Sequence, residues 1–346
     1  MHVYINDNFS KFILLKAMVD SKIAIYRLTA LWAFAECGIG GVLHAFKLPI
    51  TGLVVGGIAI TILSIIRALS GSDFRKNILQ ALAVVIVIKA TITPHAGITA
   101  YLAVAFQGIS AVIFYSLIPS FKIGTILHCM VSMIESALQK VLVLLVLYGE
   151  TLLKAIDKLG SWVSSMLDVP VDTISMSLIS GYTVFFALWG LFIAWMAIRL
   201  TKVIQSVLNK ERYTIEISKS SETLMGARRR KRKGWLILLL ILVALLIYSF
   251  FIEQEANGWI LLFRVIVVMI VFYKVIGPLL ARALASFIKK YRASNTSYMQ
   301  YVLDALPYTG VIAKKAWKEN NHRPFLGKIR HFMIDVIMYQ LYFIPK

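Results

Sequence analysis

Acidic residues are scarce in this chain of 346 residues, which holds 17 Asp and Glu against 37 Lys and Arg, for a formal net charge of +20. Charged residues of both signs make up only 16% of the chain, below the share of about a quarter that soluble domains carry. Cysteine is nearly absent as well. Cys37 and Cys129 both lie in apolar runs, which excludes a disulfide framework and indicates buried thiols.

Apolar residues make up 59% of the chain, and the mean hydropathy is +0.77. This apolar share is higher than that of a soluble domain, whose surface must contact water. We therefore expect the additional apolar residues to face lipid. A spanning helix needs about 20 mostly apolar residues. Eight stretches meet or approach that length: Ile23–Ala45, Pro49–Leu69, Ile78–Thr93, Gly97–Ile118, Ile123–Tyr148, Ile174–Leu200, Trp235–Ile252 and Trp259–Leu280. Pro94 and Gly97 follow the short third stretch, so stretches three and four alternatively form one broken or re-entrant element.

Loop charges predict the orientation, because cytoplasmic loops carry an excess of Lys and Arg. With the N-terminus inside, the basic positions Arg67, Arg75, Lys76, Lys122, Arg199, Lys202, Arg282 and Lys289 fall inside. The acidic positions Glu150, Asp157, Asp168, Asp172, Glu253 and Glu255 fall outside. We therefore predict a multi-pass protein of the cell (inner) membrane with both termini in the cytoplasm.

The predicted fold class is an all-α integral membrane protein with about eight transmembrane helices. Residues 1–200 form a six-span membrane bundle, and residues 201–233 form a basic cytoplasmic linker. A two-span module follows at 234–292, and residues 293–346 form a cytoplasmic or interfacial tail. In that tail, apolar and charged positions interleave, which suggests amphipathic helices on the inner membrane surface or on a partner.

Ionisable and amide side chains inside a membrane are costly, so each is a functional candidate. His44 and His95 lie in two Pro- and Gly-containing turns that our topology places at the outer face. Two such imidazoles can hold an anion when protonated or a metal when neutral, although zinc normally takes three or four protein ligands. The alternative is that both histidines cap helix ends. No metal is assigned.

The fifth stretch carries His128, Glu135 and Gln139 at offsets that place them on one helix face. They either contact a ligand or fix helix packing. Glu135 needs a partner, for which Lys89 and Lys140 are the candidates. Glu36 in the first stretch and Gln107 in the fourth complete the set of candidate ligand-binding residues.

Enzyme signatures are absent from the sequence. There is no Walker motif, no Gly-rich dinucleotide turn, no HExxH and no GxSxG. We predict no enzymatic activity and no cofactor. Active transport would then take its energy from an ion gradient or from a separate ATPase.

Residues 21–200 resemble the substrate-binding S component of energy-coupling-factor vitamin transporters. The stretch from Leu43 to Gly52 is similar to the turn near the outer binding site of those proteins, and Ala24, Ala30, Ala33 and Ala35 are similar to their docking surface. The resemblance implies a vitamin-like or metal-related ligand and a separate scaffold with two ATPases. The last two spans, the linker and the tail have no counterpart in a simple S component.

We therefore expect a membrane solute-binding or transport component with a separate energising partner. The alternative is a non-catalytic subunit or scaffold of a multiprotein envelope or secretion complex. The expected partners are anionic lipids, other membrane subunits and a small molecule. Six consecutive basic residues are expected to contact lipid headgroups or a protein partner, with nucleic acid less favoured: Arg228, Arg229, Arg230, Lys231, Arg232 and Lys233.

Overall fold

The computed structural model describes residues 7–45, 51–93, 97–167, 174–206, 213, 216–217 and 296–345. The seventh and eighth predicted spans, and the run of six basic residues, lie outside these ranges. The elements are, in chain order, α1 (Asp7–Phe34), the π-helical turn η1 (Ala35–Ile39), α2 (Gly40–Ala45), α3 (Thr51–Leu69), the 3-10 turn η2 (Gly71–Asp73), α4 (Phe74–Ile92), α5 (Ile98–Leu117), α6 (Phe121–Tyr148), α7 (Glu150–Leu167), α8 (Ile174–Ser206), β1 (Glu216–Ile217), α12 (Thr296–Glu319), α13 (Phe325–Tyr342) and β2 (Ile344–Pro345).

Five described helices are long and apolar enough to cross a membrane, which agrees with an all-α membrane protein. These candidate spans are Ser21–Leu43, Thr51–Leu69, Thr99–Leu117, Phe121–Val146 and Ile174–Ile204. They match five of the six stretches predicted within residues 1–200. The remaining stretch is the helix α4, which carries Arg75, Lys76 and Lys89 and so falls outside the apolar set. α4 and α5 are separate helices of 19 and 20 residues, and the broken or re-entrant arrangement of these two stretches stays a prediction.

The helix α7 lies in a segment where the sequence predicted an outer loop. Gly149 ends α6 with a φ of +62°, a conformation that glycine adopts at no steric cost, and its N–H donates to the Leu145 carbonyl. In α7, apolar positions such as Leu152 and Ile156 are half-buried, whereas Lys154 and Lys158 are exposed. The helix is amphipathic, and it has too few apolar residues to count as a candidate membrane span.

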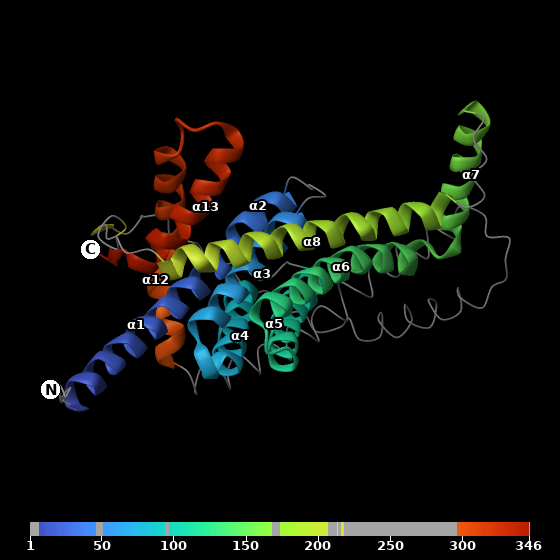
Figure 1. Cartoon of the computed structure of the whole chain (residues 1–346). Coiled ribbons are helices and arrows are strands. Elements are labelled where there is room, and N and C mark those ends of the chain that lie inside the picture. The colour runs from blue at the N-terminus through green and yellow to red at the C-terminus, as the bar shows by residue number, and fades with distance from the viewer. Residues whose placement is uncertain are drawn as a thin grey trace, which may run out of the picture.

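Asp157 of α7 fixes the start of α8. Its two carboxylate oxygens accept from the backbone N–H and the hydroxyl of Ser175, at 2.8 and 2.9 Å. A carboxylate in this place satisfies a backbone donor that the helix itself leaves open. Figure 1 shows α6 and α8 running side by side to α7, with α12 and α13 beyond the opposite end of α8, near α1.

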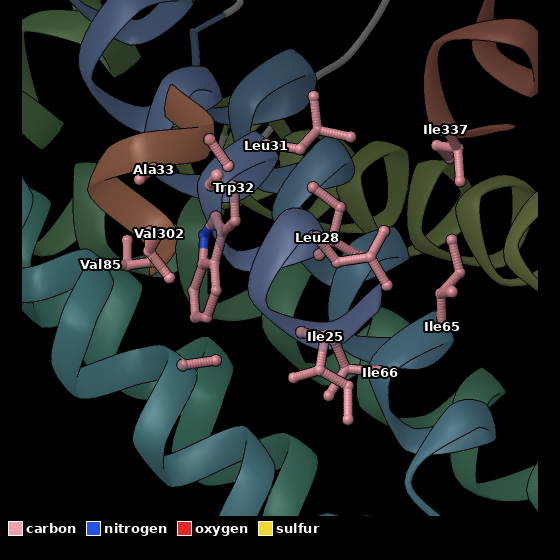
Figure 2. Packing of buried hydrophobic residues seen from close by; sticks show 14 of the residues in the cluster. Ile25, Leu28, Leu31, Trp32, Ala33, Ile65, Ile66, Val85, Val302 and Ile337 are labelled. Atoms are coloured by element: carbon pink, nitrogen blue, oxygen red, sulfur yellow. The ribbon is translucent and has the colours of Figure 1, made fainter. Parts of the chain in front are cut away.

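Two apolar cores hold the described helices together. The larger core joins α1, α3, α4 and α5 with α12 and α13, and Figure 2 shows Val302 of α12 and Val85 of α4 together on one side of Trp32 of α1. The smaller core joins α3, α6 and α8 around Met133 and Phe186. The two tail helices thus pack on α1 of the same chain, where the sequence predicted contact with the membrane surface or with a partner.

Candidate functional site

Polar side chains gather where α5 meets α6. Near one end of this interface the Gln139 amide donates to the Thr99 carbonyl at 3.0 Å, and farther along the Ser110 hydroxyl lies 3.2 Å from Nδ1 of His128. From Thr99 to Ser110 the residue numbers rise along α5, whereas those of their partners fall along α6 from Gln139 to His128. The two helices are therefore antiparallel. Gln107 therefore lies about level with Val131 and Met133, within one turn of Glu135 along α6. We call this set the polar seam: Thr99, Gln107, Ser110 and Tyr115 on α5, Thr125, His128, Ser132, Glu135 and Gln139 on α6, and Ser64 on α3.

The middle of the polar seam is a fully buried histidine between two serines. Nδ1 of His128 lies 3.2 Å from the Ser110 hydroxyl and 3.4 Å from the Ser132 hydroxyl, and the two hydroxyls lie 3.1 Å apart. Nε2 of the same ring is buried without a hydrogen-bond partner in the described part of the chain. Buried polar atoms are normally paired, because an unpaired one costs free energy. This orphaned nitrogen is therefore a candidate contact for a ligand, a water or a proton.

Two more unpaired oxygens belong to the next turn of the interface. Oε1 of Gln107 and Oε2 of Glu135 are buried, and neither has a hydrogen-bond partner among the described residues. Gly56 of α3 faces this region, since a Cβ there would lie 3.3 Å from Nε2 of Gln107 and 3.0 Å from Cε of Met133. The glycine lets α3 approach α5 and α6 closely at this level.

A groove of about 330 Å³ opens at one end of the polar seam, lined by Thr99, Gln139, Lys140, Val143 and Leu144. Gly52, at the start of α3, lies beside it, because a Cβ there would be 3.8 Å from Nζ of Lys140. The groove thus lies at the end of the bundle where α3 and α5 begin, which is the end that the loop charges predict to face outward.

The opposite end of the polar seam is built around Tyr115. Its buried hydroxyl donates to Oγ of Ser64 at 2.9 Å and lies 3.1 Å from Oγ1 of Thr125. The Tyr115 ring is also 5.7 Å from the His128 ring and 5.9 Å from the Arg67 guanidinium. Arg67 in turn reaches the Gly71 carbonyl in η2 at 3.4 Å, so the polar groups extend to that turn.

Glu36 is neutralised by an ion pair away from the polar seam. It stands in the π-helical turn η1, where one extra residue widens the helix, and its Oε2 lies 2.5 Å from Nζ of Lys89 on α4. Both side chains are buried. Lys89 was one of the two partners predicted for Glu135, and that assignment is wrong, because Lys89 pairs with Glu36 of η1.

The other predicted residues fall as follows. His44 lies near the end of α2, and His95 lies outside the described residues. Within the described part of the chain no group of three His, Cys, Asp or Glu side chains could hold a metal ion. Both cysteines are free and buried, as predicted.

Sequence reasoning missed Ser110, Ser132 and Tyr115 as members of the site. One signal was present, because Ser132 follows His128 by four residues and so lies on the same helix face. Ser110 and Tyr115 belong to another helix and could be assigned only from the packing.

Comparison with protein-family models, with curated proteins and with solved structures finds no match to this chain. Function is therefore inferred from the geometry of the site.

Proposed function

We propose that this chain is a membrane solute-binding and transport component that takes a small polar ligand in the groove at the end of the α5–α6 interface. Two unpaired oxygens carry the proposal. They are Oε1 of Gln107 and Oε2 of Glu135, which lie along the interface below the groove. A ligand that entered there would meet acceptor groups that the described protein leaves unsatisfied.

The lining of the groove indicates the chemistry of the ligand. Lys140 supplies a cation and Gln139 an amide, while Val143 and Leu144 supply an apolar wall. A volume of about 330 Å³ is at the small end of ligand pockets, which span about 300–1,000 Å³. We therefore propose a vitamin-sized or smaller solute with an acidic or carbonyl group for Lys140 and a donor group for Gln107 and Glu135.

The test is to purify the full chain from its host in mild detergent and to identify small molecules that remain bound, by mass spectrometry. The wild type is compared with Lys140→Ala and Gln139→Ala, and with Lys154→Ala in α7 as a matched control, since that lysine is exposed and far along the chain from the groove. We expect a stoichiometric solute in the wild type and the control and its loss in both groove variants.

Added solute should also raise the melting temperature, because a ligand at a hundredfold excess over its Kd stabilises the folded state by about 2.7 kcal/mol. Preparations that hold no solute, and that no solute from the host stabilises, would reject the proposal.

The alternative function is that of a non-transporting subunit or scaffold of a larger membrane complex. It is favoured by one observation: several predicted ligand-binding groups already have protein partners, such as Glu36 with Lys89 and Gln139 with Thr99. Under this alternative the groove variants would leave assembly with partner proteins unchanged, and no solute would co-purify.

A further inference from the structure

The polar seam reaches from the groove at one end of α5 and α6 to the turn η2 at the other. Gln139 contacts Thr99 beside the groove, and Glu135 lies one turn further along α6. The Ser132, Ser110 and His128 cluster follows, and then the Tyr115 hydroxyl with Ser64 and Thr125. The two helices are each long enough to span a membrane, so this order of polar groups runs along the direction of crossing.

The surroundings of the polar seam are apolar. On one side lies the core of α1, α3 and α4, and on the other lies the core formed by Met133, Phe186 and Ile193. Polar groups in such a place are costly unless they are paired, and chains of Glu and His side chains within membranes mark routes for protons. Fully buried hydroxyl and imidazole groups offer such a route without an open pore.

We propose that the polar seam carries protons across the membrane. A proton from the groove binds the Glu135 carboxylate, and the unpaired Oε2 passes it through a bridging water to the Ser132 hydroxyl, from which the Ser110 hydroxyl relays it to Nδ1 of His128. The imidazole accepts at Nδ1 and releases the proton on its unpaired Nε2 to a second water, which carries it toward the Tyr115 hydroxyl, whose ring lies 5.7 Å from the imidazole ring, and on to η2. Each hydroxyl gains one proton and gives one up, so no group is changed after one passage.

Charged and titratable groups near the route come from each element packed on α6. Lys140 stands at the groove, Arg67 of α3 stands beside Tyr115 of α5, and Tyr182 of α8 packs on the core around Met133. α7 contributes only exposed or half-buried charges at the far end of α6.

The proposal goes beyond solute binding and does not depend on it. It would let an existing proton gradient take the place of a separate ATPase as the source of energy. A solute-free assay therefore tests it independently, and a negative result in that assay would leave the solute-binding proposal standing.

The experiment reconstitutes the full chain in phosphatidylcholine vesicles that contain a pH-sensitive dye, with K⁺ and valinomycin to clamp the voltage. After an imposed pH step, we expect the wild type to equilibrate at least tenfold faster than empty vesicles. Glu135→Gln and His128→Gln should each return the rate to that of empty vesicles, and Ser110→Ala should lower it severalfold.

Ser136→Ala is the matched control, because that buried hydroxyl of α6 donates to the Ser132 carbonyl of its own helix and lies outside the proposed route. Its rate should match the wild type. Glu135→Gln preserves the size of the side chain, and all variants must elute as the wild type does before reconstitution. A wild type no faster than empty vesicles, a rate that survives in Glu135→Gln or His128→Gln, or an equal loss in Ser136→Ala would overturn the proposal.

Discussion

Glu36 and Lys89 join η1 to α4 through a buried contact, and their removal gives a test at the level of single side chains. Breaking one partner of a buried pair leaves an uncompensated charge and typically costs about 3–5 kcal/mol. We expect Glu36→Gln and Lys89→Met each to lower the free energy of unfolding in detergent by about that amount. The double variant should recover part of the loss, because neither charge remains.

The exposed pair of Glu150 and Lys154 on α7 is the matched control. Its N–O distance is 3.6 Å and both side chains face solvent, so Glu150→Gln should change stability by less than about 1 kcal/mol. Equal losses for the two glutamate substitutions would show that the buried pair of Glu36 and Lys89 stabilises the folded state no more than the exposed pair does.

The sequence identified the buried ionisable side chains but not their pairing. Glu36, Lys89, His128 and Glu135 stand out because a charge or imidazole within an apolar stretch is rare. Which of them meet depends on the packing of helices far apart in the chain. For that reason the sequence alone predicts Lys89 as a partner of Glu135 and does not identify the serines that contact His128.

Glycines set the approach of neighbouring helices, and α8 offers a matched pair to test this. A Cβ at Gly190 would lie 2.9 Å from the Cys129 carbonyl oxygen and 2.9 Å from Cα of Met130, both backbone atoms of α6 that cannot turn aside. We expect Gly190→Ala to push α6 and α8 apart and to destabilise the protein by about 1–3 kcal/mol.

Gly181→Ala on the same helix is the control. Nothing lies within 4 Å of a Cβ at Gly181, so this change should leave stability unchanged or raise it by up to about 1 kcal/mol, since alanine favours the helix. Thermal unfolding of the two variants in the same detergent makes the comparison. A Gly190→Ala variant as stable as Gly181→Ala would contradict the packing of α6 on α8.

Hydropathy predicts the candidate spanning helices well, but it does not predict the amphipathic helix α7 or the packing of the tail helices. Long apolar runs identify α3, α5, α6 and α8 because lipid and core demand the same side chains along the whole length. The helix α7 was missed because half of its face is polar. An amphipathic pattern also predicted helices in the tail, but it could not show that their apolar faces pack on α1.

For the molecule as a whole, the predicted orientation places η2 in the cytoplasm and α7 outside. Both native cysteines are buried, so Cys37→Ala and Cys129→Ala give a background free of thiols. In that background we expect Lys158→Cys to react with a membrane-impermeant maleimide in intact cells. Ser72→Cys should react only after the cells are opened, since both positions are exposed and the predicted orientation places them on opposite sides.

The reverse labelling pattern would place the N-terminus outside and would reject the positive-inside assignment. Labelling of both positions in intact cells would contradict a membrane crossing between them. Neither result would alter the packing of α12 and α13 on α1, which rests on contacts such as the Arg27 guanidinium with the Leu341 carbonyl at 2.6 Å.

The pairing of Glu36 with Lys89 also has a consequence for the order in which the protein is made. The two residues are separated by 53 positions, so the ribosome exposes the glutamate first and needs about 3–10 s more to add the lysine, at about 5–20 residues per second. During that interval α1 carries a carboxyl group without its counter-charge. A carboxylate without a partner is costly in lipid, so we expect the helix that carries Glu36 to remain at the site of membrane insertion until α4 arrives.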